Sequence, residues 1–383
     1  MAVMLSAVMS SMQQGQYDQM IDNTVGSFSG HIQIQHPEYH DEATLNHTFT
    51  VDSSLIQKVD ALDDIKTAIP RLETYSLAAG REKSRAVMVL GIDVEKEKYL
   101  SKPDSKIIAG SYFNSNSDRS VLISQGLAAF LEIQVNDTLI LIGQGFRGMS
   151  ATGGYPVQGI VRFGLPDMNK RMVYLPIETA GNYLATQNRL TSIALLLEDP
   201  RKTEIVAESL SSELSSNEQP LAVLSWQTLM PELVQAIQAD RGSAYILLLI
   251  LYIVVGFGIM GTVLMMTAER SYEFGVMLAI GTSRIKMALM IVTEMLFMSL
   301  LGVIMGILVS QPIIWYYHLN PMHFTGQAAQ AIEEYGMEPF VRFSTDVEIS
   351  IIQALIVLVI TMIISLYPII HMYKLKPVSA MRR

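Results

Sequence analysis

The stretch that decides the fold is residues 268–287, AERSYEFGVMLAIGTSRIKM, because a long apolar run lies on each side of it. The runs 243–267 and 288–310 are each long enough to cross a bilayer, since roughly 20 helical residues span a hydrocarbon layer of about 30 Å. The charged stretch between them is too short to form a domain. It therefore predicts one short helix at the membrane face, available to a partner, and we expect a mechanical signal to pass through it.

The composition is typical of a membrane protein with a substantial soluble part. Half of the 383 residues are hydrophobic, 16% are charged, and the mean hydropathy is +0.31. Net charge is −9, so a nucleic-acid partner has no electrostatic support. The chain contains no cysteine, which excludes disulfides, thiol catalysis and thiolate metal sites.

Charge asymmetry predicts the orientation in the membrane. The third apolar run, 349–370, precedes a basic tail, 371–383, whereas the segment 311–348 is acidic apart from Arg342. Its acidic residues are Glu333, Glu334, Glu338, Asp346 and Glu348. By the positive-inside tendency the tail and residues 268–287 are cytoplasmic, and 311–348 is outside. The large region before the first span is then outside too, as in a multi-pass protein of the inner membrane.

The amino terminus departs from this pattern. Residues 1–14 begin with the apolar run MAVMLSAVMSSM, which is shorter than the roughly 20 residues of a complete span. No Lys or Arg precedes that run, which disfavours a signal peptide. We interpret residues 1–14 as the outer part of a first transmembrane helix whose inner part is missing, as a late-assigned start codon would produce.

Residues 15–241 are expected to form an α+β domain. Alternating or continuous apolar patterns predict strands at 31–35, 86–93, 138–142, 155–163, 171–175 and 192–197. Residues 124–133 have helical spacing, and Asn136-Asp137 predicts the turn that follows. Residues 231–240 predict a helix that leads into the membrane.

Candidate chemistry in this domain is limited. Its histidines lie near acidic residues but match no motif in which metal ligands share a helix face, so a solvated loop is favoured over a metal site. The residues concerned are His31, His36, His40 and His47, with Glu38, Asp41 and Glu42. The glycine-rich segment 143–154 lacks the Lys-Ser or Lys-Thr of a phosphate loop and predicts a mobile hairpin tip, with or without a contact to partner or cargo. No active site is predicted.

Residues 269–284 resemble the signature of the FtsX-type permeases, the ABC-transporter group that includes MacB, LolC, LolE and FtsX. The matching positions are Glu269, Arg270, Glu273, Phe274, Gly275, Val276, Ala279, Gly281 and Arg284. The resemblance implies that these residues form a coupling helix gripped by a cytoplasmic ABC ATPase dimer. Ser271, Tyr272 and Leu278 replace residues that are often basic in the family, so this loop is less cationic than usual.

The resemblance covers nearly the whole chain. Residues 121–142, 154–161 and 172–184 are similar to the MacB-type periplasmic core, whereas 27–35 and Tyr335-Gly336-Met337 resemble the LolC/LolE-type branch. The closing residues 376–382, KPVSAMR, are similar to the family's carboxyl terminus, with Lys in place of Asp. The resemblance implies an α-helical transmembrane bundle on a four-helix plan with a large α+β MacB-type periplasmic core domain.

The physical chemistry of the loop supports the same role. Gly275 and Gly281 can bracket a short amphipathic helix. Val276, Met277 and Ile280 would then offer an apolar stripe, which suits a helix-in-groove contact. The alternative is a plain interfacial helix with snorkelling charges.

Small residues in the apolar runs suit close helix approach, either within one subunit or at a dimer seam. They are Gly258, Gly261, Gly302 and Gly306. Glu294 lies near the cytoplasmic end of its run, where it either snorkels to the interface or has a conformational role, because an intramembrane carboxylate is costly.

The sequence shows no nucleotide-binding motif, so we expect ATP and Mg²⁺ on a separate ATPase subunit, and no cofactor or catalysis in this chain. The predicted function is the membrane subunit of a mechanotransmission-type ABC system that releases or transports lipoproteins. Two alternatives remain: MacB-like efflux with a separate ATPase, and FtsX-like regulation of a cell-wall hydrolase. The expected partners are an ATPase dimer, an identical or paralogous second permease, membrane lipids, and a lipoprotein cargo or periplasmic carrier or adaptor.

Overall fold

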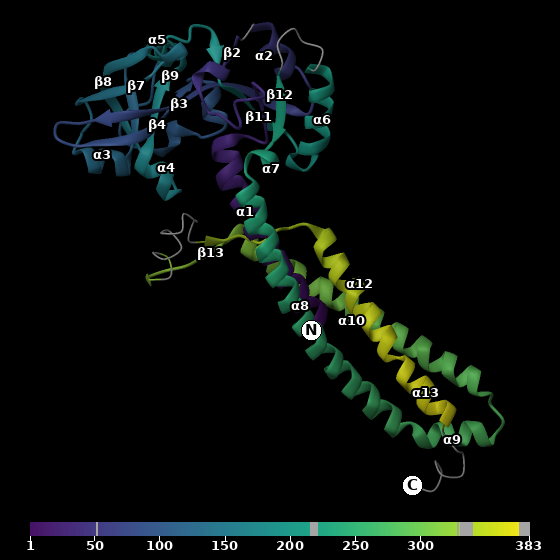
Figure 1. Cartoon of the computed structure of the whole chain (residues 1–383). Helices are drawn as coiled ribbons and strands as arrows, with labels where there is room; N and C mark the ends of the chain where they lie inside the picture. Colours follow the sequence, from purple (N-terminus) through teal and green to yellow (C-terminus); the bar gives the residue numbers. More distant parts are fainter. Residues whose placement is uncertain (51–52, 215–220, 328, 330–339, 375–383) are drawn as a thin grey trace. The chain divides into compact units, whose positions relative to one another are not determined.

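The computed structural model describes every residue except 51–52, 215–220, 328, 330–339 and 375–383 (Figure 1). The chain forms two compact units. Unit 1 comprises Met1–Gln19, Gln235–His323 and Phe340–Arg383, and unit 2 comprises Met20–Val234 and Phe324–Pro339. The motifs Tyr335-Gly336-Met337 and 376–382, and the acidic residues Glu333, Glu334 and Glu338, lie outside the described residues.

Unit 2 is built on a mixed sheet with the strand order β12-β1-β11-β3-β4-β9-β6-β8-β5, and β7 pairs with β3 and β8 off this path. The pairs β4·β9 and β6·β8 are parallel, and the other pairs are antiparallel. The strands are β1 (Ile32–Gln35), β3 (Ile65–Ala79), β4 (Ser84–Ile92), β5 (Ile107–Gly110), β6 (Val121–Ser124), β7 (Thr138–Gln144), β8 (Ser150–Val161), β9 (Met172–Pro176), β11 (Ser192–Leu197) and β12 (Ala222–Ser225). The short strands β2 (Phe49–Thr50) and β10 (Arg189–Leu190) pair separately.

The strands predicted from the sequence are all present. The prediction at 192–197 coincides with β11, and the others overlap β1, β4, β7, β8 and β9. The predicted helix at 124–133 is α3 (Gln125–Leu131), and Asn136 has the positive φ of a tight turn, +74°. The remaining helices of unit 2 are α2 (Ser53–Asp60), α4 (Pro166–Arg171), α5 (Ile177–Leu184), α6 (Thr203–Leu214) and α7 (Trp226–Leu229).

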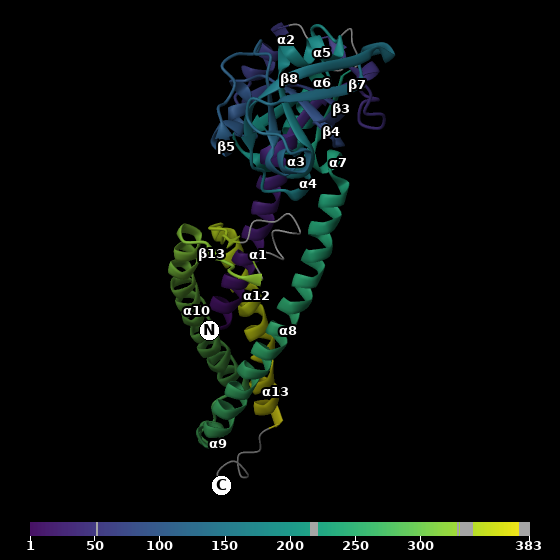
Figure 2. The ribbon, with the colours of Figure 1, turned by 90° about the vertical axis from the view of Figure 1, so that its left-hand side faces the viewer.

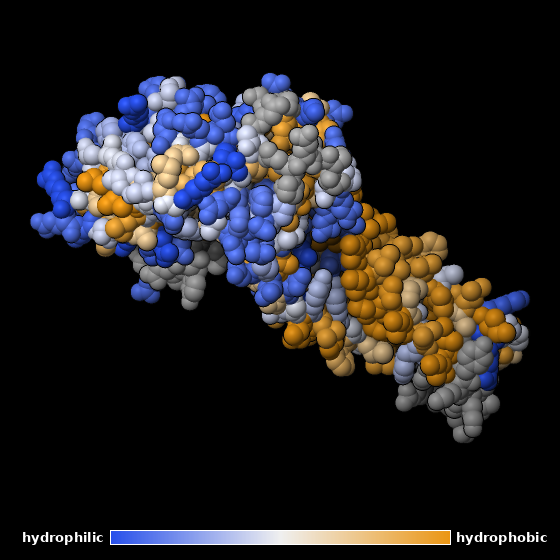
Figure 3. All heavy atoms as spheres, turned by 45° about the horizontal axis from the view of Figure 1, so that its top comes forward, coloured by the Kyte–Doolittle hydropathy of each residue, from blue (hydrophilic) through white to orange (hydrophobic). Residues whose placement is uncertain are grey.

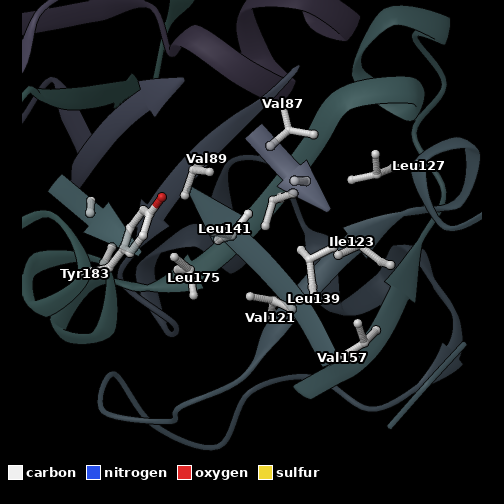
Figure 4. Close-up of a cluster of buried hydrophobic side chains, with 14 of the residues drawn as sticks. Val87, Val89, Val121, Ile123, Leu127, Leu139, Leu141, Val157, Leu175 and Tyr183 are labelled. Atoms are coloured by element: carbon white, nitrogen blue, oxygen red, sulfur yellow. The ribbon is translucent and has the colours of Figure 1, made fainter. Parts of the chain in front are cut away.

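The two faces of the sheet carry separate apolar clusters. Val87 and Val89 of β4 point into the cluster of Figure 4, together with Leu139 and Leu141 of β7. Leu90 and Ile92, which alternate with them, belong to a second cluster on the opposite face. A third cluster packs α6 on β1 and β11. Successive side chains of β4 are therefore buried on opposite faces of the sheet.

Among the described residues, three helices are long and apolar enough to cross a membrane: Pro231–Glu269, Arg284–Leu319 and Val347–Ile370. They contain the three apolar runs singled out in the sequence, and Figure 3 shows apolar side chains covering these helices. The helices are α8 (Pro231–Glu269), α10 (Arg284–Leu319), α12 (Val347–Ile364) and α13 (Leu366–Lys374); α1 (Ala2–Thr24) begins in this unit. Pro368 lies in the first turn of α13, where its missing N–H is not needed.

The predicted outer loop 311–348 contains ordered structure against α1. Its strands β13 (Met322–His323) and β14 (Phe340–Val341) pair with each other. The Ser344 N–H donates to the Ser11 carbonyl at 3.0 Å, and the Ser11 hydroxyl donates to the Ser344 carbonyl at 2.5 Å. Farther along α1, the Tyr17 hydroxyl donates to Asp240 of α8 at 2.8 Å. Backbone and side-chain bonds therefore join α1 to the outer parts of two other segments of unit 1.

Candidate functional site

Residues 268–287 form a tight connection that contains the end of α8, the short helix α9 and the start of α10. The helix α9 (Ser271–Ala279) lies between the ends of α8 and α10 (Figure 2). After Ile280, Gly281 has φ +98°, and its N–H donates to the Leu278 carbonyl at 3.1 Å. The Thr282 N–H donates to Met277 at 3.0 Å. These two bonds form a Schellman cap, which requires a positive φ at the glycine.

The two glycines of the turn therefore differ. Gly281 ends α9 as predicted, but Gly275 lies buried in the middle of the helix and does not begin it. The predicted start was wrong because α9 begins directly after α8 ends, with only Arg270 between them. On the other side, the Ser283 hydroxyl accepts from the Lys286 N–H at 3.4 Å and caps the start of α10.

One face of α9 packs into the helix bundle. Phe274 is 6% exposed and belongs to an apolar cluster with residues of α8, α10 and the end of α12. Met277 and Leu278 pack partly against the same cluster, as expected for positions three and four residues after Phe274. The other members of the cluster that are buried are Val263, Met287, Ile291, Met295 and Ile364.

The opposite face of the turn is open and mixes charge with apolar area. Ile280 is 79% exposed, Ile285 is 70% exposed, and Tyr272 is 55% exposed. The predicted stripe of Val276, Met277 and Ile280 is therefore wrong in part, because Met277 faces inward. Among the predicted coupling residues, Glu269, Glu273, Ala279 and Gly281 are exposed, Arg270, Val276 and Arg284 are half-buried, and Phe274 and Gly275 are buried.

Arg270 and Glu294 meet across the turn. The Arg270 Nη1 donates to the Glu294 Oε2, which ties the junction of α8 and α9 to α10. The side chains are 39% and 30% exposed, and both border a small cavity lined mainly by Met266, Phe274, Met295 and Met298. An ion pair satisfies a carboxylate that would be costly at the edge of the membrane. Sequence reasoning named both residues but missed their contact, because the helical period does not say which residues of two helices face each other.

The four predicted packing glycines have different surroundings. A Cβ on Gly306 would lie 2.7 Å from the Cβ of Val3, so α1 and α10 approach closely there. At Gly258, Gly261 and Gly302, no described atom lies within 4 Å of the position that a Cβ would take, apart from the neighbouring residues and the backbone of the same helix. Those three glycines therefore leave open space along α8 and α10.

Three histidines of unit 2, His31, His36 and His47, contact other side chains or the backbone, whereas His40 is exposed. Buried His31 accepts the Leu197 N–H at its Nδ1 (3.0 Å), and burial lowers its pKa. His36 stacks on His47 with 5.3 Å between the rings, and the His47 Nε2 lies 3.3 Å from Glu38. The described residues contain no group of three or more side chains placed to hold a metal ion.

The glycine-rich segment closes the β7–β8 hairpin. Its tip carries Phe146 and Arg147, and the Arg147 N–H donates to the Asn46 Oδ1 at 3.1 Å. The guanidinium of Arg189 lies 4.9 Å from the Phe146 ring. The tip is therefore attached to neighbouring segments of unit 2, and a contact with cargo or partner stays a prediction.

The fold combines long apolar helices with a large domain built on a mixed sheet covered by helices. Residues 1–213 match the MacB-like periplasmic core domain family, and residues 245–377 match the FtsX-like permease C-terminal family. The first match alone covers more than half of the chain, so the chain belongs to this family. It is an ABC transporter permease of the MacB/LolCE type in the inner membrane.

The similar proteins include members of lipoprotein-releasing systems and macrolide export proteins. LolC of the lipoprotein-releasing system of Xylella fastidiosa is 20% identical over 82% of this chain and 77% of that protein. LolE of Haemophilus influenzae is 23% identical over 63% of this chain and 58% of that protein. The macrolide export ATP-binding/permease protein MacB of Bradyrhizobium diazoefficiens is 24% identical over 63% of this chain and 37% of that protein. The chain thus spans less than two thirds of the LolE and MacB relatives.

Solved structures of isolated domains resemble part of this chain. The periplasmic region of MacB from Actinobacillus actinomycetemcomitans covers 56% of this chain and 96% of that structure, with 15% identity and a TM-score of 0.40. The extracellular domain of the transporter YknZ covers 51% of this chain and 99% of that structure, with 17% identity and a TM-score of 0.36.

Proposed function

We propose that this chain is the membrane subunit through which a separate cytoplasmic ATPase dimer moves a periplasmic domain, and that the system releases lipoproteins from the inner membrane. ATP and Mg²⁺ belong to the ATPase in this proposal, and the chain itself transmits motion without catalysing a reaction. The observation that carries it is the two-sided turn at 268–287, which is packed on one face and open on the other.

The packed face makes α9 suitable for transmitting a displacement. Phe274 contacts a cluster built from α8, α10 and α12, so a partner that pushes α9 displaces all three helices together. The open face offers Glu273, Tyr272 and Ile280 to a groove on the ATPase. Arg270 acts inside the chain in this scheme, since its guanidinium is held by Glu294.

The length of α8 supports transmission across the membrane. Its 39 residues correspond to roughly 58 Å of continuous helix, about twice the hydrocarbon thickness. A tilt imposed near Glu269 therefore moves the end at Pro231, which lies well beyond the span 243–267. In the proposed topology residues 268–287 and 371–383 are cytoplasmic, and residues 15–241 and 311–348 are outside.

A second permease subunit is part of the proposal. Gly258 and Gly261 of α8 and Gly302 of α10 have open space where a Cβ would lie. Small residues allow helices of two subunits to approach closely in lipid. An identical or paralogous permease, or lipid, occupies that space.

The LolC and LolE relatives favour lipoprotein release as the cargo step. The match to LolC extends over most of both chains, whereas the match to MacB covers 37% of that protein. The test uses spheroplasts that carry this chain with its ABC ATPase and a periplasmic carrier. ATP-dependent appearance of a lipoprotein in the soluble fraction supports the proposal, and a hydrolysis-deficient ATPase is the control. Retention of all lipoproteins, with macrolide resistance that depends on this chain, favours export instead.

A further inference from the structure

A short π-helical turn, Val25–Ser29, connects α1 to β1 in unit 2. The Gly30 N–H donates to the Val25 carbonyl at 2.8 Å, five residues back. Gly30 has φ +72°, and a Cβ there would lie 3.0 Å from the Leu195 carbonyl oxygen. Single π turns are rare in helices, and a glycine lets the backbone rotate. Left to itself, this connection would bend.

Two side chains hold the carbonyls at the end of the turn. Such carbonyls lack partners within a helix. The Arg71 Nη1 donates to the Phe28 carbonyl, and the Gln33 Nε2 donates to the Ser29 carbonyl at 2.9 Å. The Arg71 guanidinium also lies 5.6 Å from the Phe28 ring. Arg71 belongs to β3, so a strand inside the sheet holds a turn that leads to β1.

The guanidinium that holds the turn is itself fixed by Glu97. The Arg71 Nε donates to Glu97 Oε2 at 3.1 Å, and its Nη2 donates to Glu97 Oε1. Both side chains are fully buried. Glu97 Oε1 also accepts from the Ser101 hydroxyl at 2.5 Å, and that hydroxyl accepts from Tyr174 at 3.2 Å. Hydrogen bonds on both sides therefore leave the guanidinium a single position.

Stability alone does not account for this arrangement. A buried ion pair rarely stabilises a fold more than apolar side chains of the same volume, because burial removes both charges from water. An apolar pair could not donate to the Phe28 carbonyl. We propose that Arg71 is a positioning residue that makes the turn Val25–Ser29 rigid, so that a displacement of α1 reaches β3 and is not absorbed by bending. The role of this rigidity in transmitting motion rests on the proposed function, but the test of the rigidity does not.

Hydrogen exchange on the full chain in lipid nanodiscs tests the rigidity of the turn. The variant Arg71→Met/Glu97→Met removes both charges at once. We expect the amides of residues 26–30 to exchange about tenfold faster in this variant, which corresponds to a decrease of about 1.4 kcal/mol in the free energy of local opening. Exchange in β8 should not change and serves as the measure of the fold of unit 2, because β8 contacts neither Arg71 nor Glu97. The matched control is Lys96→Met, which removes a cation that caps the Ala68 carbonyl of β3 at 2.9 Å but does not contact the turn.

A distance measurement tests the same point independently. The chain has no cysteine, so Asn23→Cys, in the part of α1 that belongs to unit 2, and Ser84→Cys on β4 can carry spin labels without background. We expect a narrow distance distribution in the wild-type and Lys96→Met proteins, and a broad one in Arg71→Met/Glu97→Met. Wild-type exchange at 26–30 together with a narrow distribution in the double variant overturns the proposal.

A conservative variant decides the question if the double variant loses its fold, which faster exchange in β8 would reveal. Arg71→Lys keeps the charge, but one ammonium group cannot reproduce the guanidinium fork to Glu97 and the bond to Phe28 together. We expect faster exchange at residues 26–30 in this variant with exchange in β8 unchanged, and wild-type exchange at residues 26–30 overturns the proposal. None of these measurements needs the ATPase, so the proposed function can fail while this inference holds.

Discussion

An Arg–Glu pair joins distant parts of the chain in each unit of the molecule, and these two pairs have opposite surroundings. Arg71 and Glu97 in unit 2 are fully buried, and the guanidinium has a third acceptor in the Phe28 carbonyl. Arg270 and Glu294 in unit 1 are 39% and 30% exposed. A buried pair cannot open without leaving a charge in the protein interior, whereas a half-exposed pair can exchange its partner for water. The first pair therefore suits a fixed joint and the second a contact that opens and closes.

The largest effect is expected from removing one partner of the buried pair. Glu97→Ala leaves the Arg71 guanidinium buried without its carboxylate, and unit 2 should lose about 3–5 kcal/mol of unfolding free energy. Urea unfolding of the full chain, followed by hydrogen exchange in β4, measures the loss. Arg71→Met/Glu97→Met should recover most of it. A change below about 1 kcal/mol in Glu97→Ala would show that the burial of this pair has no energetic consequence.

The half-exposed pair should affect transmission more than stability. We expect Arg270→Gln and Glu294→Gln to change the unfolding free energy by less than about 1 kcal/mol, because water replaces the lost partner. Lipoprotein released per ATP hydrolysed should fall about tenfold, the equivalent of 1.4 kcal/mol, with the ATPase still bound. The charge-exchanged variant Arg270→Glu/Glu294→Arg should recover part of the release. Unchanged release in both single variants would contradict a role for this pair in transmission.

His31 adds a buried polar group without a charged partner, and it makes the stability of unit 2 depend on pH. Burial lowers the pKa of His31 from 6.5 in the folded state, so below pH 6.5 the unfolded chain takes up a proton that the folded chain does not. Stability should therefore fall as the pH drops below 6.5, by at most about 1.4 kcal/mol per pH unit, until the folded pKa is reached. Stability above that range is unaffected by His31.

Comparison with a variant separates the contribution of His31 to the pH dependence of stability from that of other groups. Burial raises the pKa of the Glu73 carboxyl, which acts in the opposite direction by favouring the folded state at low pH. The contribution of Glu73 cancels when wild type and His31→Asn are unfolded at the same pH, because both contain it. The difference between them should grow from pH 7 to pH 5 in the direction of a less stable wild type. A constant difference would contradict a lowered pKa at His31.

The parts of the fold that could be predicted from the sequence are those that depend on the periodicity of a single strand or helix. Alternation placed β1, apolar runs placed β4 and β11, and apolar length placed the three long helices, because burial determines the pattern of each element by itself. The end of α9 at Gly281 was also predicted, since glycine is common directly after the last residues of a helix. The sequence could not predict that Arg270 pairs with Glu294 or that Arg71 pairs with Glu97. No spacing in a sequence indicates which residues of two separate elements face each other. The predicted start of the helix at Gly275 was wrong for a related reason, because the sequence does not show that Gly275 lies buried in the middle of α9.

Glu273 extends the comparison to a charge on the open face of α9. We expect Glu273→Ala to weaken binding of the ATPase by about 0.2–1 kcal/mol, up to about fivefold in Kd, because an exposed rim charge contributes little. Titration of the ATPase onto the full chain in nanodiscs measures the Kd. Glu232→Ala, at the other end of α8, is the matched control and should leave the Kd unchanged. The effect of Glu273→Ala should also shrink as ionic strength rises, since salt screens exposed charges, whereas the Arg71–Glu97 joint is shielded from salt. Equal Kd values for both variants would remove Glu273 from the proposed ATPase contact and leave the apolar side chains Tyr272 and Ile280 to make it.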